Sequence, residues 1–189
     1  MYVFGLRSMV MALAMLATSS LAYADLDLKH LKLVRAASTG LRQAVSSAER
    51  DLKGKAYAAT SSFNGDVVLY SVKLLVGEKP VSVTIDAKTG KITGTAVVSG
   101  ENGPLLKEFA KIKGSLLAAI RAAEITAKGK TFEAAFKRIG GKFLFDVDAA
   151  ARDDAEKEVI IDATTGKIRK VTDKSADPSA GEPAAETAQ

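Results

Sequence analysis

Apolar side chains recur at helical spacing in two separate segments of the chain. They lie three or four positions apart, on one face of a helix. The first set is Leu41, Ala44, Val45, Ala48 and Leu52, and the second is Leu116, Ala119, Ile120, Ala123 and Ala127. Each set predicts an amphipathic helix that buries one face. A further helix is expected over Leu105–Lys113, with a less regular counterpart over Leu28–Ala36.

Residues that favour helix ends flank both amphipathic segments. Ser38 or Thr39 precedes the first segment and Ser115 precedes the second, where a hydroxyl accepts hydrogen bonds from the first backbone N–H groups. Gly54 and Gly129 follow the last apolar positions. A glycine there predicts a left-handed residue that ends the helix.

After each helix the apolar period changes to two, which is typical of strands with one buried face. The alternating positions are Tyr57, Ala59, Ser61, Phe63, Val68, Tyr70, Val72, Leu74, Val81, Val83 and Ile85, then Phe132, Ala134, Phe136, Phe143, Phe145, Val147, Val159 and Ile161. Gly65 and the pair Gly140–Gly141 mark short hairpins, and longer connections are expected over 77–80 and 149–156. The pattern predicts an α+β fold, a helix packed on a three- to four-stranded antiparallel sheet.

The chain is similar to itself at an offset of 75 residues. Between Leu41 and Val72, 11 of 32 positions are identical to their counterparts, and at an offset of 76, 8 of 10 positions match from Val83 to Ile92. The matches cluster and need a single inserted residue in the second half. The sequence therefore predicts two tandem copies of one unit.

A turn recurs at the end of both copies as Asp-Ala-x-Thr-Gly-Lys. The carboxylates of Asp86 and Asp162 are placed to accept backbone N–H bonds across the turn. Gly90 and Gly166 occupy the position at which a positive φ is expected. These four residues are predicted to have a structural role.

The order of these elements resembles the PepSY domain. The matching residues are Tyr70-Ser71-Val72 with Ile85–Ile92, and Phe145-Asp146-Val147 with Ile161–Ile168, and the resemblance covers most of 41–172 in two copies. It implies a module of the cell envelope that binds a partner or restrains a protease. Two departures matter, since no peptidase follows the repeats and Phe145 lacks the hydroxyl of Tyr70. Tyr70 is therefore a candidate for a polar contact with a partner. The alternative is that both rings face the core and that the Tyr70 hydroxyl only reaches water at the rim of the sheet.

The N-terminus has the features of a secretory leader. Arg7 is followed by the apolar run Met9–Ala17 and by Ala22-Tyr23-Ala24, a small-x-small cleavage site. The run is shorter than the roughly 20 residues that span a bilayer. We expect cleavage after Ala24 and a periplasmic or secreted protein without an integral membrane segment. The predicted organisation is a leader over 1–24, repeats over 25–100 and 101–172, and a disordered acidic tail over 173–189.

Charge is unevenly distributed along the chain. The full chain has a formal net charge of +5, whereas residues 25–172 have +7 once Arg7 and the acidic 173–189 segment are set apart. The basic body favours anionic envelope partners. Nucleic acid is not expected, because no basic run is interleaved with stacking aromatics. The chain has no cysteine, so its stability comes from burial and hydrogen bonds rather than disulfides.

Residues with catalytic chemistry are sparse. His30 is the single histidine and is expected at the surface, away from any nucleophile. The acidic group Asp146, Asp148, Asp153 and Asp154 is expected in a loop that lacks the glycine of a calcium turn. No catalytic residue, metal site or cofactor is predicted.

Two function classes follow from these features. The first is a non-enzymatic interaction module that binds or restrains a peptidase or another extracytoplasmic protein, with exposed sheet edges available for strand addition. The alternative is a binder of an anionic envelope component or a metal ion. The sequence does not specify the oligomeric state.

Overall fold

The computed structural model describes residues 19–100, 103–153 and 155–174. Each copy contributes two helices and four strands. In the first copy these are α1 (Ser19–Ala36), α2 (Leu41–Leu52), β1 (Lys55–Asn64), β2 (Val67–Val76), β3 (Lys79–Asp86) and β4 (Ile92–Val97). In the second they are α3 (Gly103–Lys111), α4 (Leu116–Ala127), β5 (Gly129–Ile139), β6 (Lys142–Ala151), β7 (Glu156–Asp162) and β8 (Ile168–Asp173).

All of the strands belong to one antiparallel sheet, in the order β4-β3-β2-β1-β5-β6-β7-β8. The sequence predicts three to four strands per copy, and the structure has four. The two copies join into a single eight-stranded sheet, which the sequence does not predict. The seam between them is the β1–β5 pairing, which consists of Ala58↔Ala135, Ala59↔Ala134 and Thr60↔Glu133. Ala59 and Ala134 are equivalent residues of the two copies and pair with each other. The copies are therefore related by a pseudo-twofold axis at this pair.

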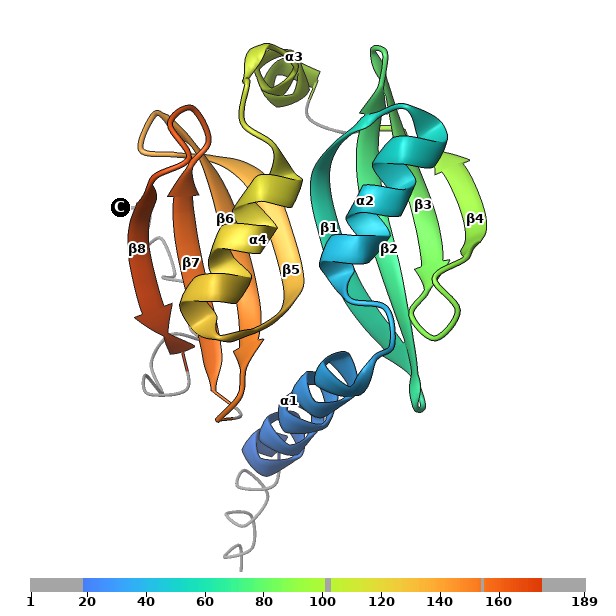
Figure 1. Cartoon of the computed structure of the whole chain (residues 1–189), viewed down its shortest axis with the longest axis vertical. Coiled ribbons are helices and arrows are strands. Elements are labelled where there is room, and N and C mark those ends of the chain that lie inside the picture. The colour runs from blue at the N-terminus through green and yellow to red at the C-terminus, as the bar shows by residue number, and fades with distance from the viewer. Residues whose placement is uncertain (1–18, 101–102, 154, 175–189) are drawn as a thin grey trace, which may run out of the picture.

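The amphipathic helices α2 and α4 lie on the same face of the sheet, each over its own copy (Figure 1). The alternating apolar residues of the strands point toward them. Tyr70 and Val72 in β2 and Phe145 and Val147 in β6 are at most 2% exposed. The apolar residues of the strands and those of the amphipathic helices thus pack into one hydrophobic core, as the sequence predicts.

The leading helices α1 and α3 lie at opposite ends of the seam (Figure 1). Phe109 of α3 contacts Tyr57 of the first copy and Phe136 of the second, with ring centroids 6.1 and 4.9 Å away. From α1, His30 contacts both Phe63 of the first copy and Phe132 of the second. Each leading helix therefore holds the two copies together across a short seam.

The helix ends differ in part from expectation. Ser115 accepts from the Ala118 N–H as predicted, whereas the N-cap of α2 is Gly40, without a side-chain bond. The left-handed C-cap residues are Lys53 and Lys128, with φ of 52° and 53°. The glycines after them serve packing instead. A Cβ at Gly129, for example, would lie 2.0 Å from the Ala150 carbonyl oxygen.

The structure corrects two boundaries that the sequence predicts in the second copy. The predicted connection over 149–156 is shorter, because Ala149–Ala151 continue β6 as buried residues. Asp173 ends β8, and Lys174 is ion-paired with Asp148, so the acidic tail does not begin at 173. Residues 1–18 and 175–189, with most of the leader and tail, lie outside the described residues. No helix in the described part is long and apolar enough to cross a membrane.

Candidate functional site

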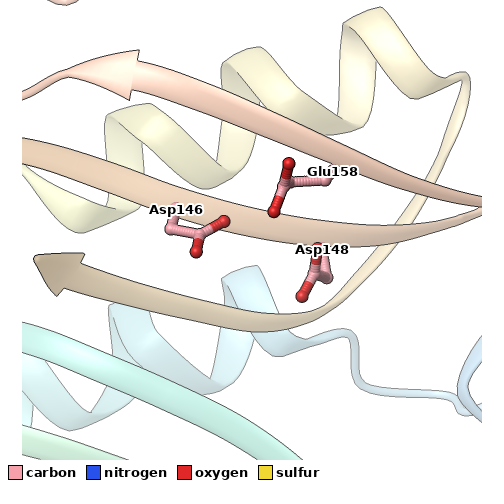
Figure 2. Close-up of side chains that lie close together, drawn as sticks. All are labelled: Asp146, Asp148 and Glu158. Atoms are coloured by element: carbon pink, nitrogen blue, oxygen red, sulfur yellow. The ribbon is translucent and has the colours of Figure 1, made fainter. Parts of the chain in front are cut away.

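An acidic cluster lies on the face of the sheet opposite α4. Because Phe145 and Val147 point toward the core, the side chains of Asp146 and Asp148 point the other way. Glu158 of β7 lies directly across from Asp148, and carboxylate oxygens of the three residues lie within 4.8 Å of one another (Figure 2). Asp146 and Asp148 are thus strand residues rather than members of a loop as expected. The alternation of apolar and polar residues from Phe143 to Ala149 is the sequence signal that would have placed both aspartates in a strand.

Two lysines partly neutralise this cluster. Lys137 Nζ lies 2.6 Å from Asp146, and Lys174 Nζ lies 2.9 Å from Asp148. Burial raises the pKa of Asp148 to about 6, against the opposing effect of Lys174. The carboxylates flanking Lys174 raise the pKa of its ammonium group, because they favour the charged form despite burial. Carboxylate oxygens suit calcium or magnesium. An ion here would have to displace both lysines, so the contacts favour an ion-pair network.

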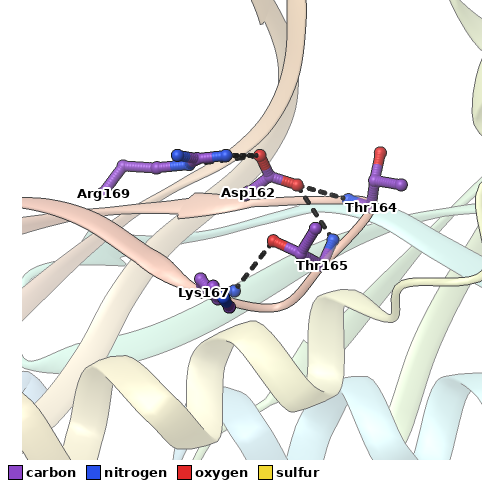
Figure 3. Close-up of polar contacts among 5 residues, drawn as sticks. All are labelled: Asp162, Thr164, Thr165, Lys167 and Arg169. Atoms are coloured by element: carbon purple, nitrogen blue, oxygen red, sulfur yellow. Dashed lines mark hydrogen bonds and ion pairs between the residues drawn. The ribbon is translucent and has the colours of Figure 1, made fainter.

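The repeated turns have the predicted geometry. Asp162 Oδ1 accepts the Thr164 and Thr165 N–H groups at 3.0 and 2.9 Å (Figure 3), and Asp86 Oδ1 accepts Lys88 and Thr89 in the first copy. Gly90 and Gly166 have φ of 69° and 71°, which confirms the expected positive φ. Asp86 and Asp162 therefore close the β3–β4 and β7–β8 hairpins.

The two turns differ in electrostatics. Arg169 donates two bonds to Asp162 Oδ2, from Nη2 at 2.6 Å and Nε at 3.2 Å (Figure 3). These bonds, with the backbone donors, lower the pKa of Asp162. Thr93 occupies the equivalent position in the first copy and donates to Thr84 O. The pKa of Asp86 is lowered by the bonds from Thr89.

Tyr70 does not present its hydroxyl to a partner. Its side chain is fully buried, and the hydroxyl donates to the Thr39 carbonyl oxygen at 2.8 Å. Burial raises its pKa to about 12. The equivalent Phe145 ring lies beside Gly114, which stands where the first copy has Thr39. The Tyr/Phe difference therefore follows from core packing, and this structure leaves Tyr70 no surface for the expected polar contact.

His30 is half-buried rather than at the open surface. Its Nε2 lies 3.0 Å from Ser61 Oγ, and its ring lies 4.8 Å from the Phe63 ring. These contacts attach α1 to the end of β1. They give His30 a packing role.

The edge strand β4 is exposed along almost its whole length. Residues 93–97 are exposed, and Val97 is 70% exposed. β4 pairs on one side with β3, and in the described chain no strand pairs with its other side. An unpaired edge presents a row of backbone donors and acceptors to another extended chain.

The opposite edge, β8, differs from β4 in charge. It contains Arg169, Lys170 and Asp173, whereas 92–97 read Ile-Thr-Gly-Thr-Ala-Val without a charge or a proline. Charged side chains protect an edge against pairing with another chain. Sequence reasoning identified free edges in general and missed the asymmetry, which becomes visible once the strand order shows that β4 and β8 are the edges.

Comparison with known proteins agrees with the repeat architecture. The model of the PepSY family, described as "Peptidase propeptide and YPEB domain", matches residues 41–96 and 113–172. No curated protein matches the chain. Two solved structures are similar: a protein described as a lipoprotein of Clostridium difficile 630, at 16% identity, and the YpmB protein of Bacillus subtilis, at 20%. Their TM-scores are 0.42 and 0.32, and the matches cover 73% and 69% of this chain and 95% and 94% of theirs. The two family matches together span more than half of the sequence, so the chain belongs to the PepSY family, with two copies of the domain in tandem.

Proposed function

We propose that this protein is an extracytoplasmic, non-catalytic interaction module that binds an extended segment of a peptidase or another envelope protein along β4. The observation that carries the proposal is the uncharged, exposed outer edge of that strand. Strand addition takes its affinity from backbone hydrogen bonds and its specificity from alternate side chains. PepSY membership and the predicted leader are consistent with such a role at the envelope.

The hydrogen-bond register shows which groups of β4 are available. The Val98 N–H donates to Pro80 O, toward β3. In an antiparallel ladder the direction alternates at each residue, so the N–H groups of Thr95 and Val97 point away from β3. The pairing is regular from Gly94 to Val97, after an irregularity next to Ile92. A partner strand would therefore find two outward donors on this stretch.

The side chains of β4 define the chemistry of the partner segment. Thr95 and Val97 have β-branched side chains on one face of the strand. On the other face, Gly94 and Ala96 have almost no side chain that would keep a partner at a distance. A segment rich in β-branched or aromatic residues, without charges opposite Val97, would fit this edge. The charged β8 edge would not accept the same segment.

The experiment removes an outward donor from one edge at a time. Proline lacks an N–H group and is tolerated at an edge position whose N–H faces solvent. Thr95→Pro is the test variant, and Val171→Pro, at the equivalent position of β8, is the matched control. Each protein is used as bait in an envelope extract. A retrieved protein is then purified and titrated against wild type and both variants.

The expected result is that Thr95→Pro loses the purified partner while Val171→Pro retains it, with similar unfolding transitions for both variants. Equal retention by both variants would exclude β4 as the binding edge. Equal loss with intact folding would also contradict the proposal, because it would place the contact elsewhere on the sheet.

A further inference from the structure

A basic pocket lies where the C-terminal ends of α1 and α4 approach the β6–β7 turn. Its volume is about 730 Å³. The charged side chains that line it are Arg35, Lys128, Lys130, Arg152 and Glu124, and the exposed Ile125 lies at its rim. Four cations thus share one cavity with a single carboxylate among the described lining residues. Such a concave site with an excess of positive charge attracts anions.

The carboxylate does not neutralise this pocket. Glu124 Oε2 accepts from Arg42 Nε at 2.7 Å, and Arg42 lies outside the lining. Within the described residues, neither Lys128 nor Arg152 forms an ion pair with the protein. Positive charge therefore remains available to a ligand.

The first copy shows which of these cations the fold requires. Lys55, the equivalent of Lys130, donates to the carbonyl of Phe109 at 3.2 Å, just as Lys130 donates to Ala37 at 2.8 Å. These lysines hold the ends of the leading helices in both copies. Arg35 of the first copy, in contrast, corresponds to Ala110 of the second, and Arg152 of the second copy corresponds to Gly77 of the first. Each arginine is present in one copy only, so the architecture shared by the two copies does not need it.

We propose that this pocket binds a phosphate-bearing ligand with at least two negative charges, either as a lipid headgroup or as a soluble phosphorylated molecule. Guanidinium and ammonium groups are the side chains that recognise phosphate oxygens. A phosphate monoester offers three acceptor oxygens and a charge of about −1.5 to −2. Ile125 is 68% exposed and is placed to contact an apolar portion of the ligand. This site is separate from β4 and rests on different residues.

The test compares two double variants that remove the same charge. Lys128→Gln/Arg152→Gln acts on the pocket. Lys53→Gln/Lys88→Gln is the control in the first copy, where Lys53 shares the left-handed backbone of Lys128. The probes are glycerol phosphate, measured by calorimetry, and phosphatidylcholine vesicles with and without phosphatidic acid, whose headgroup is a phosphate monoester, measured by co-sedimentation. Unfolding curves establish that all proteins are folded.

We expect the pocket variant to weaken binding roughly tenfold or more, because charge-assisted hydrogen bonds are lost, and the control to change it less than about twofold, as expected for screened surface charge. Loss of glycerol phosphate binding would identify a soluble ligand, and loss of vesicle binding alone would identify a lipid headgroup; both support the proposal. Equal weakening by the two variants would overturn it in favour of general surface charge. Absence of binding by wild type to every probe would also overturn it.

Discussion

The carboxyl group of Asp148 should make the stability of the protein depend on pH in an unusual direction. Its side chain is 14% exposed and lies 2.9 Å from Lys174. Burial raises its pKa to about 6, whereas an unfolded chain holds this group near 3.9. The folded state therefore binds the proton more tightly. The contribution of Asp148 to the free energy of unfolding should be largest below about pH 4 and should be lost as the pH rises through about 6.

The size of this effect follows from the difference between the two pKa values. A difference of about 2 units corresponds to at most about 3 kcal/mol of unfolding free energy between pH 4 and pH 7. Asp148→Asn imitates the protonated carboxyl group at every pH. The variant should lose this component of the pH dependence, although Lys174 keeps its second partner, Glu156, at 3.1 Å.

The measurement is urea unfolding of wild type and each variant from about pH 2.5 to pH 7.5. We expect the stability difference between wild type and Asp148→Asn to change with pH, in favour of the variant as the pH rises. Asp162→Asn is the control of opposite sign, since Arg169 lowers the pKa of Asp162 and its contribution is lost only as the pH falls below about 4. Parallel stability curves for wild type and Asp148→Asn would refute the reasoning.

Three further predictions concern stability and use denaturant unfolding. Gly166→Val should lower the free energy of unfolding by about 1–2 kcal/mol through left-handed backbone strain. Gly90→Val should lower it further, because an added Cβ would lie 3.1 Å from Thr39 Oγ1. Equal losses for the two variants would contradict the role of this contact. Gly114→Ala should be severely destabilising, since its Cβ would lie 2.0 Å from a backbone oxygen, whereas Gly103→Ala has open space and should be nearly neutral. Tyr70→Phe should cost about 1–2 kcal/mol by leaving a buried carbonyl without its donor, and an unchanged midpoint would argue against that bond.

The elements of the fold were predictable because their signals are local. Helical spacing at Leu41 and alternation at Tyr70 are properties of neighbouring residues, and the recurrence of Asp86 to Gly90 at Asp162 to Gly166 identified the repeat. The merged sheet was not predictable in the same way. Its seam consists of three pairs of alanine, threonine and glutamate residues, which have no pattern that specifies a partner strand.

The errors at candidate sites have related physical causes. Ala149–Ala151 lack the β-branched residues that mark a strand, so the adjacent Asp146 and Asp148 appeared to belong to a loop. His30 looked isolated because Ser61 and Phe63 are distant in sequence and come together through α1. The basic pocket was invisible for the same reason, since Arg35 and Arg152 are separated by most of the protein. The sequence revealed excess positive charge without showing where it gathers.

The pairing of Ala59 with its own equivalent Ala134 has a consequence for the origin of the chain. A self-complementary contact of this kind closes equally well between two identical molecules. A chain with a single copy would therefore meet a second chain through the same strand, each supplying a leading helix to the joint. Three residue pairs between two strands give such an encounter little affinity, and a covalent connection replaces it with an effective concentration in the millimolar range. Gene duplication would thus have converted a weak, dilution-sensitive dimer into a permanent one, and freed each copy to acquire residues that the other lacks, such as Arg35 in the first copy and Arg152 in the second.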